Sequence, residues 1–264
     1  MLTIADKLTI MTTLQMIALI FARCLGTTFF VPIFARMEIS KWVRVIFAVL
    51  LTFLVAPTLL ADREALVELK NVEHWALFTP LILREMLWGA LIGLTLKIFF
   101  EGVYLAGETI AKLGGISVAE SFDSNIGAEI SSVSKLLFWT AFAVFITMHG
   151  CELFLDGFLR SFIEVAPGEP TSPSEFVKKT VEVLGCSFTL AFKIAAPVCL
   201  STLTVYITLG VLEKIFPQMN LLAIGFGCNA LLTIVIMILG IGVFCVCFQD
   251  ELAIFWERCF GFNN

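Results

Sequence analysis

The chain has 264 residues, of which 59% are hydrophobic and only 15% are charged, whereas soluble domains average roughly 45–50% apolar and about 25% charged residues. This composition excludes an ordinary soluble domain and predicts an integral membrane protein with several helical spans. The formal net charge of −5 also excludes a nucleic-acid-binding protein, because it provides no basic surface for phosphates.

Six apolar stretches predict the helices, since a lipid span needs about 20 apolar residues. In chain order they cover residues 8–34, 43–61, 77–100, 136–155, 183–212 and 221–249. The first is expected to be a helix of the mature protein and not a cleaved signal peptide, because Lys7 gives only a weak basic start and no small-residue cleavage site follows. The last contains no charged residue.

Several charged residues lie inside these stretches or near their ends, where lipid alone does not satisfy them. A charged side chain at the centre of a span costs about 2.5–3.5 kcal/mol on insertion scales. Among them are Arg23, Glu108, Lys193 and Glu213. They can line an ion or substrate path through a single chain, but the favoured interpretation is pairing with a neighbouring helix or subunit. Lysines and arginines outside the spans divide almost equally between the two sides, so they set no orientation.

Two connections between the apolar stretches stand out. Residues 165–175, VAPGEPTSPSE, contain three prolines and a glycine, which predicts an exposed turn and the best candidate for an internal boundary. Residues 107–127, GETIAKLGGISVAESFDSNIG, are polar and contain four glycines. Glycine adopts backbone conformations that other residues avoid, so Gly114-Gly115 is expected to form a bend that can rearrange.

The motifs of common enzymes are missing or incomplete. Gly114-Gly115 lacks the lysine and the frame of a phosphate-binding P-loop. The run from His149 to Glu152 offers one imidazole, whereas an intramembrane metalloprotease carries two in H-E-x-x-H. No G-x-S-x-G elbow is present, and the eight cysteines form no C-x-x-C pair. We therefore expect no enzymatic activity, no metal and no cofactor.

The connection between the last two apolar helices carries the most specific string, FPQMNLLAIGF, at residues 216–226. Pro217 stops the incoming helix and Asn220 is a good N-cap for the next one. The string resembles the C-terminal hairpin signature of the FliR/SctT family, the export-gate proteins of type III secretion. Its signature residues here are Pro217, Gln218, Met219 and Asn220. Met219 and the IGF that follows are most similar to the flagellar FliR branch.

Four other stretches resemble the same family, in the family's order along the chain. They are ARCLGTTFFVPIFARMEISKWVRV at 22–45, GETIAKLGGISVAESFD at 107–123, HGCELFLDGFLRSFIEVAPGE at 149–169 and AAPVCLSTLTVYITLGVLEKIFPQMN at 195–220. The resemblance covers nearly the whole chain. It implies an all-α, membrane-type protein whose hairpin helices form part of a helical, multi-subunit export-gate cone.

The resemblance also implies a division of the chain and a function. Residues 1–170 would be a FliP-like part that includes the glycine-rich segment 107–127, and residues 176–264 would be a FliQ-like helical hairpin. The implied function is that of a non-enzymatic core subunit of the flagellar export gate, a channel for unfolded proteins. The alternatives are a virulence-type export-gate subunit and a stand-alone transporter with several spans.

The implied partners are FliP-like and FliQ-like subunits, FlhB-like and FlhA-like components, and exported unfolded proteins, at the flagellar basal body in the bacterial inner membrane. In this family the glycine-rich segment forms a plug that closes the channel. The resemblance therefore implies a gating role for Gly114, Gly115, Ile116, Ser117, Val118 and Phe122. Irregular backbone at membrane depth is tolerated where it faces protein or a water-filled cavity. The alternative is a loop that simply packs on its neighbours.

Overall fold

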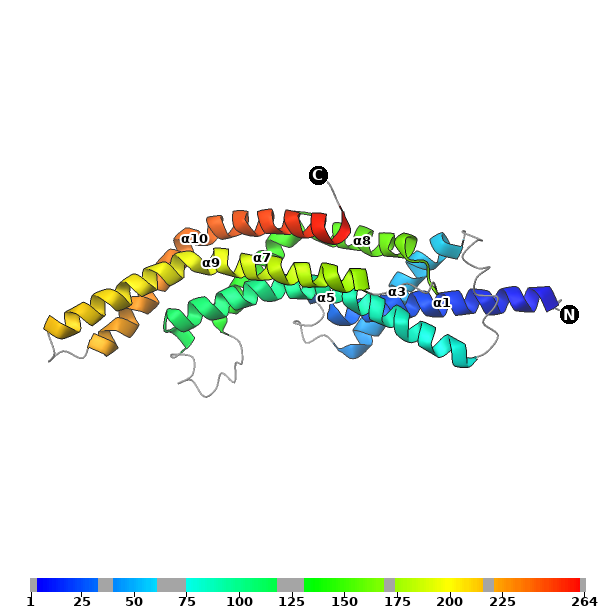
Figure 1. Ribbon diagram of the computed structural model, residues 1–264, viewed down its shortest axis with the longest axis horizontal. Coiled ribbons are helices and arrows are strands. Elements are labelled where there is room, and N and C mark those ends of the chain that lie inside the picture. Colours follow the sequence, from blue (N-terminus) through cyan, green and yellow to red (C-terminus); the bar gives the residue numbers. More distant parts are fainter. Residues whose placement is uncertain are drawn as a thin grey trace. The chain divides into compact units, whose positions relative to one another are not determined.

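The computed structural model describes residues 4–32, 40–60, 75–117, 131–168, 174–215 and 221–261. These residues contain helices and turns but no strand, which confirms the all-α prediction. In chain order the helices are α1 (Ile4–Phe30), α3 (Lys41–Leu60), α5 (Trp75–Leu113), α7 (Ser132–Thr147), α8 (Gly150–Glu164), α9 (Ser174–Ile215) and α10 (Leu221–Phe260) (Figure 1).

Five helical segments in the described residues are long and apolar enough to cross a membrane. They are Met11–Phe30, Lys41–Leu59, Phe78–Leu113, Thr180–Ile215 and Gly225–Cys259. A sixth span results if α7 and α8, which meet at a 70° bend, are counted together. Only 17% of the most apolar window of Gly225–Cys259 is buried within the chain, so this part of α10 is mostly exposed in the isolated chain.

The predicted helix over 136–155 is two helices, which corrects that expectation. The break falls at His149, whose φ of +56° is in the left-handed region that L-residues other than glycine rarely adopt. Gly150 follows at once, and a Cβ atom placed there would lie 2.5 Å from the ring of Phe145. The absence of a side chain at Gly150 therefore lets the chain turn directly over the end of α7.

The described residues form two compact units, and the chain passes from one to the other within continuous helices. The first unit contains residues 1–98 and 152–182, and the second contains 99–151 and 183–264. The division into a FliP-like part (1–170) and a FliQ-like hairpin (176–264) rests on resemblance and not on internal contacts. It therefore stays a prediction.

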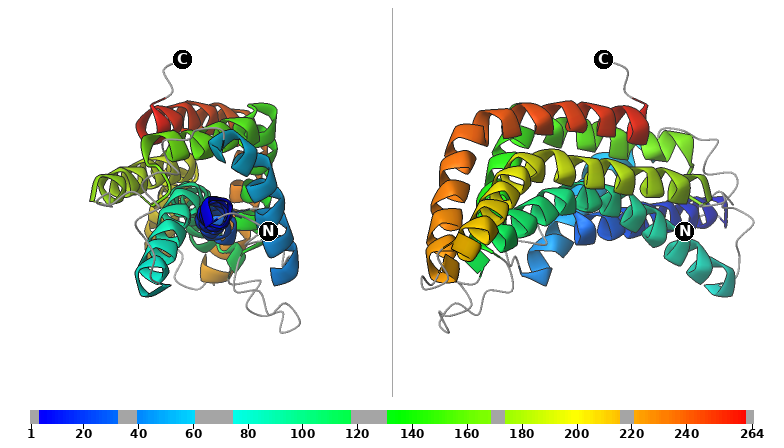
Figure 2. Two further views of the ribbon diagram at one scale, coloured as in Figure 1. Left: turned by 90° about the vertical axis from the view of Figure 1, so that its right-hand side faces the viewer. Right: turned by 60° about the vertical axis from the view of Figure 1, so that its left-hand side comes forward.

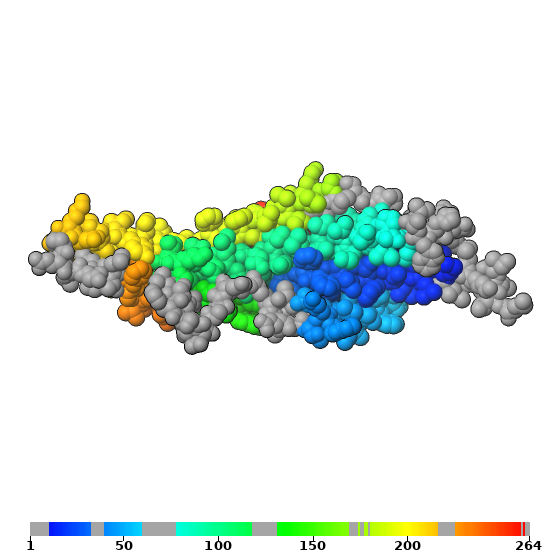
Figure 3. Space-filling view, turned by 90° about the horizontal axis from the view of Figure 1, so that it is seen from below, coloured from blue at the N-terminus to red at the C-terminus, as the bar shows by residue number. Residues whose placement is uncertain are grey.

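Glycines bring α1 and α5 into close contact in the first unit. An added Cβ at Gly26 would collide with the carbonyl of Met86, and one at Gly89 would collide with the carbonyl of Arg23. At Gly93 it would lie 2.5 Å from the carbonyl oxygen of Thr27. Small residues at such spacing allow two membrane helices to approach closely, and Figure 3 shows α1 and the first part of α5 in direct contact.

Aromatic side chains form the core of the second unit. The Phe99 ring on α5 lies 4.8 Å from Phe255 and 5.6 Å from Phe248 of α10, measured between centroids. Phe100 contacts Phe138 and Phe145 of α7 at 5.6 and 5.4 Å. In this unit α9 and α10 run side by side as a hairpin, and α10 bends between its first part, drawn in orange, and its last part, drawn in red (Figure 2).

Candidate functional site

The helix α5 continues through the first residues of the glycine-rich segment and ends at a glycine turn. The N–H of Gly114 donates to the carbonyl of Ile110 (2.8 Å), and that of Gly115 donates to the carbonyl of Lys112 (3.3 Å). Gly115 has φ = +75°, which strongly favours glycine because a side chain there is strained. A Cβ at Gly114 would lie 2.5 Å from Oγ1 of Thr233 on α10, so the turn packs directly against that helix.

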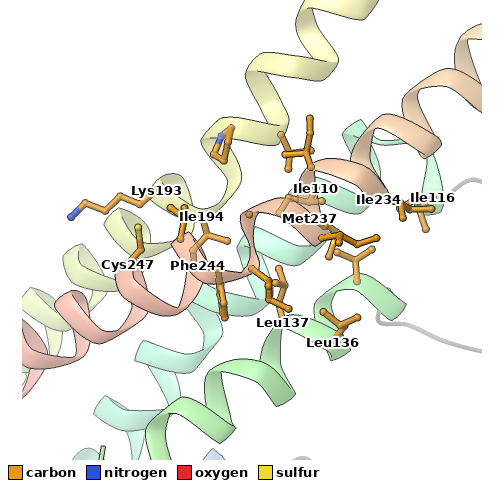
Figure 4. Close-up of a pocket in the computed structure, with 18 of the residues that line it drawn as sticks. Ile110, Ile116, Leu136, Leu137, Lys193, Ile194, Ile234, Met237, Phe244 and Cys247 are labelled. Atoms are coloured by element: carbon orange, nitrogen blue, oxygen red, sulfur yellow. The ribbon is translucent and has the colours of Figure 1, made fainter.

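An apolar cavity of about 460 Å³ adjoins the turn. Helices α5, α7, α9 and α10 all contribute to its wall, as does Ile116 just after the turn (Figure 4). The wall includes Ile110, Leu137, Ile194, Pro197, Met237 and Phe244. Of the residues predicted to close the channel, Ile116 thus lines an apolar cavity. Val118 and Phe122 lie outside the described residues.

Glu108 connects the end of α5 with the start of α7. Its Oε1 atom accepts hydrogen bonds from the backbone N–H of Ser131 (2.9 Å) and from the hydroxyl of Ser134 (3.2 Å). The hydroxyl of Ser131 in turn accepts from the N–H of Val133 (3.2 Å) and caps α7. The ion pair of Glu108 with Lys112 is long (3.6 Å) and its lysine is 69% exposed. The main role of Glu108 within the chain is therefore to fix the start of α7.

A buried ion pair organises the first unit. Arg23 of α1 donates from Nε to Oε2 of Glu85 on α5 at 2.7 Å, and the two side chains are 1% and 0% exposed. The Nη atoms of Arg23 donate to the carbonyls of Ser161 (2.9 Å) and Val165 (3.1 Å). The guanidinium carbon lies 4.4 Å from the centroid of the Phe162 ring.

These contacts place a positive charge at the C-terminal end of α8, where the unpaired carbonyls of a helix favour a cation. Glu85 is satisfied on its other side, since Oε1 accepts from the N–H of Gly168 at 3.1 Å. The buried pair therefore holds α1, α5 and the turn after α8 together. A buried charge is tolerated when it is paired and fully hydrogen-bonded.

Lys193 of α9 pairs with Glu251 of α10 at 2.5 Å. The lysine side chain is 49% exposed, whereas the glutamate is only 3% exposed. Figure 4 shows that Lys193 extends its amino group away from the apolar side chains of the cavity. Arg23, Glu108 and Lys193 thus each have a partner within the chain, and their assignment to subunit contacts stays a prediction.

Sequence reasoning missed several residues of these clusters. Glu85 was visible as a charge within the third apolar stretch, but nothing in the sequence pairs it with Arg23. Glu251 lies just beyond the last predicted span, and Thr233 looks like an ordinary helix residue.

The hairpin motif, Pro217 to Asn220, lies outside the described residues. Among the described residues there is no group of three or more His, Cys, Asp or Glu side chains that could hold a metal ion.

Comparison with known proteins shows where the chain has relatives. Residues 14–254 match the family model described as bacterial export proteins, family 1. The flagellar biosynthetic protein FliR of Pectobacterium carotovorum subsp. carotovorum is 28% identical, over 84% of this chain and 81% of the relative. The FliR protein of Bacillus subtilis strain 168 is 25% identical, over 89% of this chain and 90% of its own length. The FliR protein of Aquifex aeolicus strain VF5 is 26% identical, over 95% of this chain and 96% of its own length. The similarity therefore extends over both units.

Proposed function

Because the chain belongs to family 1 of the bacterial export proteins, we propose that it is a core subunit of the flagellar type III protein export gate. The observation that carries this proposal is the similarity to FliR proteins along almost the entire chain. The five to six membrane-type helices agree with a component that is embedded in a membrane. We place it in the inner membrane, at the export apparatus of the flagellar basal body.

In this proposal the chain is a structural component without catalytic activity. It assembles with FliP-like and FliQ-like subunits, and with FlhB-like and FlhA-like components, around a channel for unfolded proteins. The incomplete burial of α9 and α10 within the chain supports such an assembly, since less than half of their most apolar windows, 44% and 17%, is buried. The exposed apolar side chains of these helices, such as Leu200, Leu203 and Leu239, are then covered by partner helices or lipid.

The glycine-rich segment is the part of the chain that we assign to channel closure. The turn at Gly114-Gly115 and the apolar wall beside it support this role, because a bend-forming backbone next to an apolar surface can seal a bore against water. Deletion of residues 114–122 is then expected to leave assembly intact and to make the membrane permeable to ions. An equally tight membrane with this deletion would show that the segment only packs against its neighbours.

The proposed function is tested by expressing the chain with and without the FliP-like and FliQ-like proteins and purifying it in mild detergent. We expect an unstable or aggregated protein when it is expressed alone, and one defined complex when the partners are present. A stable monomer that binds a small solute would contradict the proposal and would indicate a stand-alone transporter.

A further inference from the structure

Two buried polar side chains on α10 lack the hydrogen bonds that such groups normally make. Asn229 and Thr233 are both 0% exposed. Within the described residues, neither the amide nitrogen and oxygen of Asn229 nor the hydroxyl of Thr233 has a hydrogen-bond partner. Buried polar groups in native proteins are almost always paired, so these two require an explanation.

Hydroxyl side chains elsewhere in the same hairpin behave differently. On α9 the hydroxyl of Thr202 donates to the carbonyl of Val198 at 3.0 Å. Thr204 bonds to the carbonyl of Leu200 at 2.9 Å. This bond to the preceding turn is open to any threonine within a helix. The hydroxyl of Thr233 does not make it, so its orientation is not explained by the helix that carries it.

Both side chains lie on the face of α10 that meets the glycine turn. Asn229 and Thr233 are four residues apart and therefore share one face of the helix. Oγ1 of Thr233 lies 2.5 Å from the position that a Cβ atom of Gly114 would occupy. The hydroxyl of Tyr206 on α9 donates to the carbonyl of Leu113 at 3.1 Å, so the hairpin already binds the last residue before the turn.

We propose that Asn229 and Thr233 are positioning residues that hydrogen-bond to the backbone of the Gly114-Gly115 turn when the turn adopts a second conformation. In the conformation described here, the N–H groups of the two glycines bond to carbonyls of α5. A rearrangement that breaks those bonds leaves peptide groups in need of new partners. The amide of Asn229 and the hydroxyl of Thr233 can each donate and accept, so they can meet either kind of peptide group.

This inference rests on the proposed function. It adds that Asn229 and Thr233 control how readily the glycine turn changes conformation. The present conformation leaves Asn229 and Thr233 unpaired, and the second conformation pairs them. The two side chains therefore reduce the free-energy difference between the two conformations of the turn. The FliQ-like hairpin would in this way determine how readily the glycine-rich segment moves.

The test uses the complete export gate in cells that lack their own copy of this chain. Asn229→Leu and Thr233→Val remove the polar groups and keep similar shapes, whereas Thr233→Ser keeps the hydroxyl. The matched control is Thr202→Val, which removes a buried hydroxyl that already has partners in its own helix. For each variant the rate of export of a flagellar protein and the thermal midpoint of the purified complex are measured.

We expect Asn229→Leu and Thr233→Val each to lower the export rate about fivefold, the effect of one net hydrogen bond on a two-state equilibrium. Their thermal midpoints should be unchanged or higher, because each variant removes an unpaired buried group. Thr233→Ser and Thr202→Val should export at the unmodified rate. Unmodified export in both test variants, or a lower thermal midpoint, would overturn the inference. Failure of the proposed function would appear separately, since the unmodified chain would then not restore export.

Discussion

Replacing Arg23 tests how the first unit is held together. Arg23→Leu leaves the carboxylate of Glu85 buried without its partner, since that side chain is 0% exposed. The carbonyls of Ser161 and Val165 each lose a hydrogen bond from the guanidinium group as well. Removing one member of a buried ion pair costs about 3–5 kcal/mol. At about 2 °C per kcal/mol for a chain of this size, the thermal midpoint of the purified export gate should fall by roughly 6 °C or more.

A surface ion pair of the same unit provides the matched control. Arg160 and Asp156 lie 3.0 Å apart on α8, and their side chains are 52% and 50% exposed. Exposed pairs contribute about 0.2–1 kcal/mol, so Arg160→Leu should lower the midpoint by about 2 °C at most. The double variant Arg23→Leu, Glu85→Leu should recover most of the loss, because it leaves no unpaired buried charge. Equal midpoints for Arg23→Leu and Arg160→Leu would refute the reasoning.

Three further predictions follow from the second unit. Gly115→Ala forces a side chain into φ = +75° and should destabilise the turn by about 1–2 kcal/mol, measured as a lower thermal midpoint. Gly210→Ala, on the open surface of α9, should not lower the midpoint. Glu108→Ala removes the acceptor of the Ser131 amide, which should exchange its hydrogen faster, while Lys112→Ala should leave that exchange rate unchanged. Lys193→Ala should lower the thermal midpoint more than Lys193→Arg, because only the alanine variant leaves the buried carboxylate of Glu251 unpaired; equal midpoints would contradict this.

The sequence predicts the helical, membrane-embedded nature of the chain because hydrophobic length alone determines it. It does not locate the break at His149, where a left-handed residue and the small Gly150 divide one apolar stretch into two helices. It also treats residues 107–113 as part of a polar connection, although they complete α5. Residues 108–113 contain no glycine, and Glu108, Ala111, Lys112 and Leu113 are good helix formers, so the helix continues as far as the glycines at 114 and 115.

A single sequence does not show which charged residues form ion pairs with each other, and the reason is geometric. Arg23 and Glu85 are 62 residues apart, and Lys193 and Glu251 are 58 residues apart. Their pairing depends on how α1 packs on α5, and α9 on α10, which periodicity does not specify. The same holds for Thr233, whose position opposite Gly114 follows from the packing of α10 against the end of α5.

The most direct test of the proposed export channel is a photo-crosslinking amino acid at Ser117, immediately after the glycine turn. The variant chain is assembled into the export gate in cells that produce a flagellar substrate with a folded C-terminal domain, which stalls during export. We predict that light links Ser117 of this chain to the stalled substrate, and that the same probe at Trp42, which is 77% exposed on α3, gives no such product. Crosslinking only to other gate subunits, with no substrate at Ser117, would contradict the assignment of this segment to the export channel.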